Sequence, residues 1–440
     1  MLPPSPQEPL PPLRLSAPPL SGRIEAAVTL STVARLVASG AAVSKADLVP
    51  AAGLARTTVS AAVDELLDRG LLHIDGTRPT AGRGRPADRL ALSPRGGHVL
   101  LADVGASSAH LAVVDLSQRV LARTHVAVDV RDGPDAVLRT VETELAELRE
   151  SALPALRESA LSAERGGALS AERGGAPTGR VAGVPVGAVV IGLPGPVDGT
   201  RGVPVRPPIM PGWHAYPVAA RLSRTFGCPA VLENDVNLRA LGEARALPAD
   251  QTPLLFVKVG TGIGGGLVGR EGVLHHGADG AAGDIGHVRV RGAPDDACVC
   301  GNVGCIEAVA SAGAIARRLG EPGPPVPIDE VRTLLARGDP AAVAAVREAA
   351  GLIGELVATL VHFYNPARVT IGGGLAAASD ELLAGVRSVA YQRALPLATR
   401  NLVLTNSVLG EYAGLAGATV LGIERVLSTE SIGLLLARSD

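Results

Sequence analysis

The segment Asp284-Ile-Gly-His287 is followed shortly by Cys298-Val-Cys300-Gly-Asn-Val-Gly-Cys305-Ile-Glu307. The chain has four cysteines, and three of them fall within this run, which makes three unrelated thiols the weaker alternative. Three thiolates and one imidazole form the tetrahedral set that suits a structural Zn²⁺ ion, and four protein ligands leave no position open for catalysis. The fourth cysteine, Cys228, reads as a small buried hydrophobe. The pattern therefore predicts a structural zinc held by His287, Cys298, Cys300 and Cys305.

The composition is that of a folded protein of several domains. At about 150 residues per domain, 440 residues predict about three domains. Hydrophobic residues make up 47% of the chain and charged residues 19%, which excludes a disordered protein. The net charge of −2 excludes a bulk polycation but leaves room for a local nucleic-acid site. Aromatic residues are only 2%, so a surface that stacks single-stranded bases is not expected.

The chain shows no secretion or membrane segment. The first 22 residues contain eight prolines and no apolar core, so we expect a flexible extended tail there. An uncharged run at 181–197 contains three prolines and four glycines, which prevents a membrane helix. Clustered cysteines favour a metal site in a reducing compartment over disulfides. These features predict a cytoplasmic protein with no membrane partner.

Residues 23–95 have the outline of a winged helix-turn-helix. Apolar residues recur with a helical period in three segments, and Ser44 is placed to cap the second of them. Two short apolar runs follow, separated by a loop rich in Gly, Pro and Arg, and they predict a two-stranded hairpin. The expected helices cover 23–39, a short segment after Ser44, and 56–69, and the expected strands cover 71–74 and 89–92.

The third helix and the loop of this head carry the residues expected to contact DNA. The head has ten basic and seven acidic residues, so the distribution of charge matters more than its sum. Arg83 and Arg85 in the loop are placed to reach phosphates or a minor groove. The alternative is a small three-helix module with a solvated Arg-rich loop. Four residues at the start of the third helix occupy the positions that enter the major groove: Arg56, Thr57, Thr58 and Ser60.

From residue 98 the chain alternates strands, glycine-rich turns and helices, which predicts an α/β architecture. Two glycine-rich turns, 260–266 and 372–374, follow strand-like runs, and a third candidate begins at Asp103. Glycine lets backbone N–H groups converge on a phosphate. The segment Glu233-Asn-Asp235 ends another apolar strand, where a carboxylate can accept a proton from a bound hydroxyl. The alternative is that Asp235 only caps the following helix.

These motifs, in this order, resemble the ROK family (repressors, open reading frames and sugar kinases). The resemblance covers about residues 98–425, and the head resembles that of the ROK repressors. It implies an actin/hexokinase-like fold, with a sugar and nucleotide cleft between two α/β lobes. The matching motifs are Gly192 to Asp198, Pro211-Gly-Trp213, Glu233-Asn-Asp235, Gly260 to Gly266, Gly283 to His287, Cys298 to Glu307 and Gly372 to Gly374.

The resemblance also implies a role for individual residues. Asp235 matches the catalytic base of the family's kinases, and His287 matches both a zinc ligand and a sugar contact, which its two ring nitrogens allow. The matched sugar-binding positions are Asn234, Asp235, Asp284, His287 and Glu307. The matched nucleotide-binding positions, which would take ATP and Mg²⁺ only in a kinase, are Asp103, Gly105, Ser107, Gly260, Thr261, Gly262, Gly264, Gly372, Gly373 and Gly374.

The departures from the kinase pattern fall mainly in the phosphate loop. Where the kinases read Asp-x-Gly-Gly-Thr-Lys, this chain has Ala106 at the second glycine and Ser108 at the lysine. A Cβ hinders close approach to phosphate, and loss of the lysine removes a charge that phosphoryl transfer uses. Asp284 replaces a Glu, and Ile209-Met210 replaces an Asn of the sugar pocket. The nucleotide site is therefore expected to be degraded, and the sugar pocket altered.

The sequence thus predicts a sugar-responsive transcriptional regulator, with operator DNA and a sugar as partners, acting as a homodimer or homotetramer. The alternative is an ATP-dependent sugar kinase that keeps a DNA-binding head. The expected organisation is a tail at 1–22, the winged helix-turn-helix at 23–95, a first lobe at 98–230 with about 400–440, and a second lobe with the zinc motif at 231–399.

Overall fold

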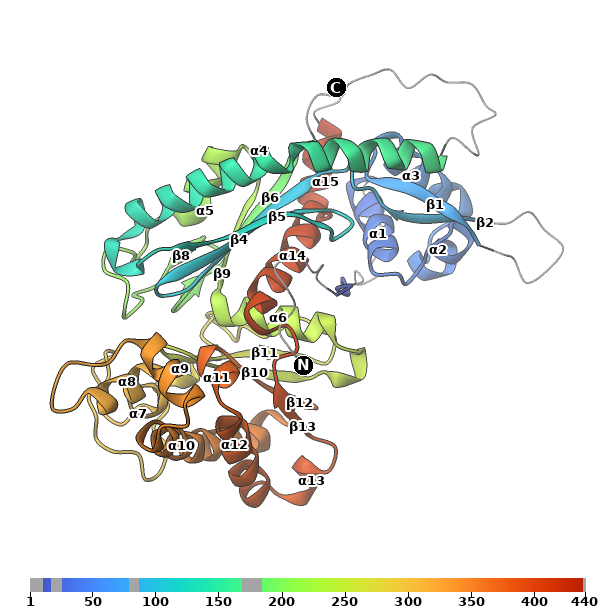
Figure 1. Ribbon diagram of the computed structural model, residues 1–440. Helices are drawn as coiled ribbons and strands as arrows, with labels where there is room; N and C mark the ends of the chain where they lie inside the picture. Colours follow the sequence, from blue (N-terminus) through green and yellow to red (C-terminus); the bar gives the residue numbers. More distant parts are fainter. Residues whose placement is uncertain (1–10, 17–25, 79–86, 168–183, 438–440) are drawn as a thin grey trace.

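The computed structural model describes residues 11–16, 26–78, 87–167 and 184–437 (Figure 1). The DNA-contact candidates Arg83 and Arg85 lie outside these ranges. Every helix in the described ranges is too short or not apolar enough to cross a membrane.

The head has the expected order of three helices and a hairpin. Ser44 caps the second helix by accepting a hydrogen bond from the amide of Asp47, whereas Ala55 gives the third helix no side-chain cap. The strands pair with Leu72 opposite Leu92, and both are longer than expected. The elements are α1 (Ala26–Ala38), α2 (Lys45–Ala52), α3 (Arg56–Asp68), β1 (Leu72–Arg78) and β2 (Ala87–Leu92).

A five-stranded sheet follows, in the order β5-β4-β3-β6-β9. The central strand β3 is buried along its whole length because helices cover both of its faces. Leu100 and Val104 pack with α4 and α5, and the alternate residues Val99 and Leu101 pack with α14. The strands are β3 (His98–Val104), β4 (Ser108–Asp115), β5 (Val120–Ala127), β6 (Val186–Leu193) and β9 (Ala230–Asn234), and the helices are α4 (Pro134–Gly167), α5 (Val218–Phe226) and α14 (Ala413–Val426).

The second sheet has four strands in the order β11-β10-β12-β13. Helix α6 covers one face, and α10 and α12 cover the other. Because β13 pairs with β12, the chain leaves this sheet after Asn406 and not at about residue 400. The elements are α6 (Asp235–Ala246), β10 (Leu254–Val259), β11 (Ile263–Val268), α10 (Pro340–Tyr364), β12 (Arg368–Gly372), α12 (Asp380–Arg393) and β13 (Val403–Asn406).

The remaining elements are short, and the last of them packs against α1 of the head (Figure 1). They are η1 (Val130–Asp132), β7 (Val197–Asp198), β8 (Val203–Pro204), η2 (Ala249–Gln251), η3 (Ile285–His287), α7 (Ile306–Ala310), α8 (Ala312–Gly320), α9 (Ile328–Ala336), α11 (Gly374–Ala378), α13 (Pro396–Thr399), η4 (Gly410–Tyr412) and α15 (Thr429–Ala437).

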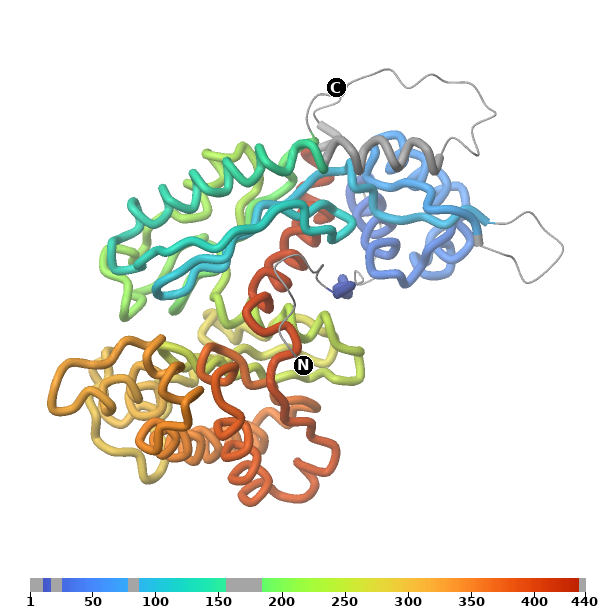
Figure 2. Tube along the Cα trace, viewed as in Figure 1, coloured from blue at the N-terminus to red at the C-terminus, as the bar shows by residue number. Residues whose placement is uncertain are grey.

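Helices α6 and α14 join the two sheets, and their backbones touch. Figure 2 shows the chain returning along α14 from the second sheet to the first. A Cβ added at Gly417 would stand 1.9 Å from the carbonyl oxygen of Leu238, and one added at Gly242 would stand 2.2 Å from that of Ala413. Only glycine permits this approach. The crossing of α6 and α14 is therefore fixed by backbone contact.

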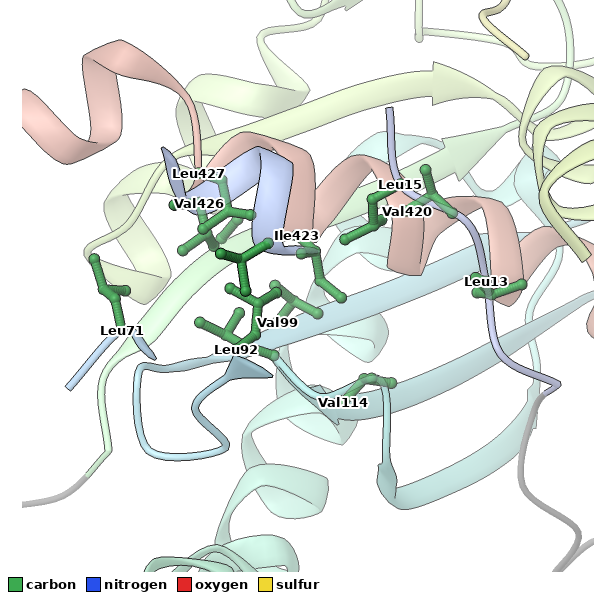
Figure 3. Close-up of a cluster of buried hydrophobic side chains, with 14 of the residues drawn as sticks. Leu13, Leu15, Leu71, Leu92, Val99, Val114, Val420, Ile423, Val426 and Leu427 are labelled. Atoms are coloured by element: carbon green, nitrogen blue, oxygen red, sulfur yellow. The ribbon is translucent and has the colours of Figure 1, made fainter. Parts of the chain in front are cut away.

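One continuous core joins the head to the first sheet. Leu71 and Leu92 of the head pack with Val99 of β3 and with Ile423 of α14 (Figure 3). The buried hydroxyl of Ser31 on α1 also donates to the carbonyl of Leu427, at 2.7 Å. The head is thus packed against the C-terminal helices and is not merely tethered to them.

The expectation of a flexible tail is wrong for residues 11–16. Leu13 and Leu15 are only 4% and 6% exposed and lie beside α14 (Figure 3). Pro11 and Pro12 restrict the backbone at the start of this segment, and the two leucines then place their side chains on one apolar face. The rest of the predicted tail lies outside the described residues.

Candidate functional site

A pocket between the two sheets gathers all five predicted sugar-binding residues. Asn234 and Asp235 come from the junction of β9 and α6, Asp284 precedes η3, His287 is its last residue, and Glu307 lies on α7. The glycine-rich turn 260–266 and the loop 277–283 complete the wall, together with two polar residues that the sequence did not indicate. The additional lining residues include Gly262, Gly264, Gly280 to Gly283, Asn237 and Lys258.

Asn234, and not Asp235, caps helix α6. Its Oδ1 accepts hydrogen bonds from the amides of Val236 and Asn237, at 2.9 and 3.1 Å, and its Nδ2 donates to the carbonyl of Gly195 at 2.9 Å. The alternative role of Asp235 as a cap is therefore wrong. Asn234 fixes the start of α6, and Asp235 is left to face the pocket.

Asp235 forms an ion pair with Lys258. The carboxylate is 2% exposed, and the ammonium group of Lys258 on β10 donates to its Oδ2. Lys258 was missed by the sequence reasoning, although a single lysine in the apolar run of β10 was a usable signal. The pair occupies one of the acceptor positions that a base needs to receive a hydroxyl proton.

Glu307 holds the glycine turn against the pocket. Its Oε2 accepts a hydrogen bond from the amide of Ile263 at 3.0 Å. A Cβ at Gly262 would stand 2.3 Å from the same oxygen, so a larger residue there would displace the carboxylate. The turn therefore depends on Glu307 for its position, and the glycine has a packing reason besides any contact with phosphate.

A second loop is attached to β9 through Glu233 and His276, neither of which was predicted as a site residue. Glu233 accepts hydrogen bonds from the amide of Asn234, from Nδ2 of Asn237 and, at 2.8 Å, from the ring of His276. The hydrogen bond to Glu233 raises the pKa of His276 above 6.5. The amide of Ala282 donates to the carbonyl of His276 and closes the base of the loop. This pair therefore fixes the loop 277–283 over the pocket.

The four predicted metal ligands converge as expected. Their ligand atoms all lie within 4.8 Å of one another, with 3.6 Å between Cys298 Sγ and His287 Nδ1 and 3.7 Å between Cys300 Sγ and Cys305 Sγ. Metal–sulfur bonds of about 2.3 Å in tetrahedral geometry place two sulfurs about 3.8 Å apart, so the cluster fits one metal ion. Burial raises the pKa of Cys305 to about 12, and a bound cation would offset this. Cys228 is buried in the first sheet's core, as expected.

His287 lies at the boundary between the metal cluster and the pocket. Its Nδ1 faces Cys298, and the residue also lines the pocket. The two nitrogens of an imidazole point in different directions, so one ring can serve a metal and a ligand. The metal cluster can thus orient a pocket residue.

The predicted nucleotide-binding residues lie at the ends of three strands, β3, β10 and β12. Gly262 and Gly264 line the pocket, whereas the other eight lie outside its lining. Asp103 is buried on β3 and pairs with Arg239 of α6 at 2.6 Å. Burial raises the pKa of Asp103 and the guanidinium opposes that shift. Gly105 and Ser107 follow β3, Gly260 and Thr261 follow β10, and Gly372, Gly373 and Gly374 join β12 to α11.

The described DNA-contact candidates lie at the start of α3. Arg56, Thr57 and Thr58 are exposed, and Ser60 is half-buried. The ammonium group of Lys45 on α2 donates to Ser60 at 3.3 Å and pairs with Asp64. The first turn of α3 therefore presents an exposed polar surface.

Comparison with known proteins shows which family this chain resembles. The ROK family model matches residues 180–425. A putative xylose repressor from Caldicellulosiruptor sp. (strain Rt8B.4) is 26% identical over 401 residues, which are 88% of this chain and 93% of that protein. A glucokinase from Thermotoga maritima is 34% identical over 255 residues, which are 54% of this chain and 80% of that enzyme.

A solved structure shows the same fold over nearly the full length. It is a ROK family transcriptional regulator described as a homologue of the E. coli MLC protein, with a TM-score of 0.71 and 23% identity, covering 94% of this chain and 99% of that one. The expected actin/hexokinase-like arrangement of two α/β lobes is confirmed. Motifs, pocket and family match agree, and the chain belongs to the ROK family.

Proposed function

We propose that this protein is a sugar-responsive, DNA-binding transcriptional repressor, in which a sugar bound in the pocket changes the affinity of the head for operator DNA. The observation that carries the proposal is the continuous core that joins the head to the first sheet and α14. The similarity to the xylose repressor extends over 88% of this chain, whereas the glucokinase similarity extends over 54%. The full-length organisation therefore favours a regulator.

The head is assigned as a winged helix-turn-helix, with α3 as the recognition helix. Gly53 ends α2 in the left-handed conformation at φ 65° and turns the chain toward α3. Arg56, Thr57 and Thr58 are exposed at the end of α3 that would enter the major groove. The acidic residues Asp64 and Asp68 follow later in the helix, where they would lie farther from DNA. The hairpin β1–β2 is the wing, and its loop carries Arg83 and Arg85.

The pocket is assigned to a sugar, and the cysteine cluster to zinc. Carboxylates and amides at the pocket wall suit hydroxyl groups, because each can pair with a donor or acceptor of the ligand. Zinc would be held by His287, Cys298, Cys300 and Cys305, with the ion as a structural element. The proposal includes action in the cytoplasm as a homodimer or homotetramer, in which two heads contact the two halves of an operator.

The alternative, a sugar kinase, is favoured by one observation: Asp235 faces the pocket at the position of the family's catalytic base. Two ion pairs oppose it. Lys258 pairs with Asp235, and Arg239 pairs with Asp103 in the first phosphate loop. Together with Ala106 and Ser108, these pairs leave the cleft poorly suited to ATP and Mg²⁺.

The two functions are separated by two measurements on the same preparation. Selection from random duplex DNA should yield a preferred operator, and a panel of sugars should change its affinity in fluorescence anisotropy. A coupled assay for ADP release with the same sugars should show no turnover. If no DNA sequence is preferred, the proposed repressor function is wrong. If ADP is released and this release disappears in Asp235→Ala, the protein is a sugar kinase.

A further inference from the structure

Residues 11–16 connect the pocket helix α6 to the head. We propose that this segment, hereafter the strap, couples ligand binding in the pocket to the DNA affinity of the head. The inference rests on the proposed repressor function and adds the route by which the pocket acts on the head. Figure 1 shows the strap between α14, α6 and the head.

The strap is attached first to the last turn of α6. The guanidinium of Arg14 donates to the carbonyls of Leu247 and Ala244, at 2.9 and 2.8 Å. These carbonyls lie at the end of the helix, where no intrahelical donor is available for them. The backbone of Arg14 also exchanges two hydrogen bonds with Arg245, whose carbonyl accepts and whose guanidinium donates. Arg14 thus follows any displacement of this end of α6.

The opposite end of α6 is the pocket. The helix begins at Asp235, and Asn234 caps it. A helix of 12 residues moves as a nearly rigid rod, because each turn is bonded to the next. A ligand that changes the position of Asp235 would therefore also move Arg245 and the strap.

The strap is attached next to α14 and the head. The amide and hydroxyl of Ser16 both donate to Glu424 on α14, at 2.8 and 2.7 Å. The same hydroxyl accepts a hydrogen bond from Arg35 of α1, at 2.8 Å. Glu424 also pairs with Arg245 at 3.2 Å. One carboxylate thus connects the end of α6, the strap and, through Ser16, the first helix of the head.

The strap is attached a third time, through Leu13, to Gln118 of the first lobe. The side-chain amide of Gln118 donates to the carbonyl of Leu13 and accepts from its amide, at 2.8 and 2.7 Å. This is the pattern with which a neighbouring β-strand would bind an extended residue. Gln118 lies in the turn between β4 and β5, so Leu13 is bonded to the first sheet. The next residue of the strap, Arg14, is bonded to α6. Relative motion of the two lobes would therefore pull on Arg14 and Ser16.

A segment that only stabilises the fold would make the same contacts. The test therefore measures how strongly sugar binding changes the affinity for operator. The double variant Arg14→Ala/Ser16→Ala of the full chain is compared with the wild type in three titrations: operator without sugar, sugar without operator, and operator with saturating sugar. The probe sugar is the panel member that most changes wild-type operator affinity. We expect the first two affinities to stay within about threefold, while the sugar effect on operator affinity falls at least tenfold.

Two further variants make the result specific. Gln118→Ala releases Leu13 without removing a bond to α6 or α1, and it should lower the sugar effect in the same direction. Arg131→Ala changes an exposed arginine of η1, away from the strap, and should leave all three titrations unchanged. Thermal unfolding of each variant confirms that it is folded.

The outcomes distinguish the strap from the function on which it rests. If the double variant Arg14→Ala/Ser16→Ala keeps the affinity for operator alone, the affinity for sugar alone and a sugar effect of wild-type size, the coupling role of the strap is wrong. The proposed repressor function would not be affected by that result. A wild-type operator affinity that ignores every sugar would overturn the proposed function, and the strap with it. A loss of operator affinity in the double variant without any sugar would assign the strap to the stability of the head and would also overturn the coupling role.

Discussion

The ammonium group of Lys258 is bonded to the carboxylate of Asp235, and the pair connects strand β10 of the second sheet to the first residue of α6. The position of this pocket carboxylate therefore depends on the second lobe. A sugar hydroxyl that binds Asp235 would compete with the ammonium group of Lys258 for this carboxylate.

Asp235→Asn and Glu307→Gln should each abolish the response to sugar while leaving operator binding without sugar nearly intact. The substitution at 235 removes the partner of Lys258, and the one at 307 weakens the bond to the amide of Ile263. A pocket built to pair with hydroxyls loses several kcal/mol when one pairing is broken, so sugar affinity should fall about 100-fold or more. Isothermal titration measures this loss. A response at wild-type sugar concentrations in either variant would refute the assigned pocket.

Purified protein should contain one zinc per chain, bound more weakly in acid because protons compete for the ligands. Removing the ion frees the cluster that positions His287, so sugar binding should be lost before the fold is. Cys300→Ser should therefore bind operator without responding to sugar. Cys228→Ala, in the core of the first sheet, is the matched control and should retain the metal and the response. Less than about half a zinc per chain in metal analysis, with no chelator used, would contradict the assignment.

Sugar affinity should fall as the pH rises through the raised pKa of His276. The protonated ring pairs with Glu233, so its contribution is fully present below 6.5, the unfolded value, and is lost above the higher native pKa. The loop 277–283 is then held less firmly over the pocket. His276→Gln should reduce sugar affinity and remove this component of the pH profile. The control His275→Gln changes the exposed neighbouring residue and should keep this component of the pH profile. An unchanged pH profile in His276→Gln would refute the role of the pair formed by His276 and Glu233.

The buried ring of His98 should make the protein sensitive to acid. Burial is the main cause that lowers its pKa to about 4, and the charge of Arg149 adds to it. The unfolded chain takes up this proton near pH 6.5 and the native state only near 4, so stability falls as the pH decreases between these values. At pH 5 the cost is about 2 kcal/mol.

His98→Leu should remove that part of the acid sensitivity, as measured by urea unfolding at pH 7 and pH 5. His110, whose pKa burial also lowers to about 4, keeps a remainder. An unchanged difference between the two pH values would show that His98 is not responsible.

Arg56→Ala should alter the operator sequence that the protein prefers, at a cost of about 1–3 kcal/mol at the affected base pair. The pair Arg83→Ala/Arg85→Ala should instead lower affinity for all sequences and flatten its salt dependence by about one unit per lost phosphate contact. Selection from random DNA and titrations at several salt concentrations separate the two effects. Unchanged affinity and preference in both variants would show that the head is not the DNA-binding element.

Local patterns made much of this molecule predictable. The four metal ligands and the cap at Ser44 depend on residues near one another in sequence, and the structure brings them together as expected. The pairs formed by Lys258 and by His276 were missed because each joins segments whose approach only the tertiary fold determines. The tail was misjudged because its prolines outweighed a short alternation of leucines, which was the available signal.

Helix α6 is held against α14 at two points, Leu238 and Gly242, which lie on either side of the middle of the helix. The midpoint of these contacts, residue 240, lies five residues from Asp235 and five from Arg245, which at 1.5 Å per residue gives two arms of about 8 Å. A small rotation of α6 about this midpoint would move the strap end about as far as the pocket end, and in the opposite direction. In the proposed coupling, a displacement of Asp235 would therefore reach Arg14 with about the same size and the opposite direction.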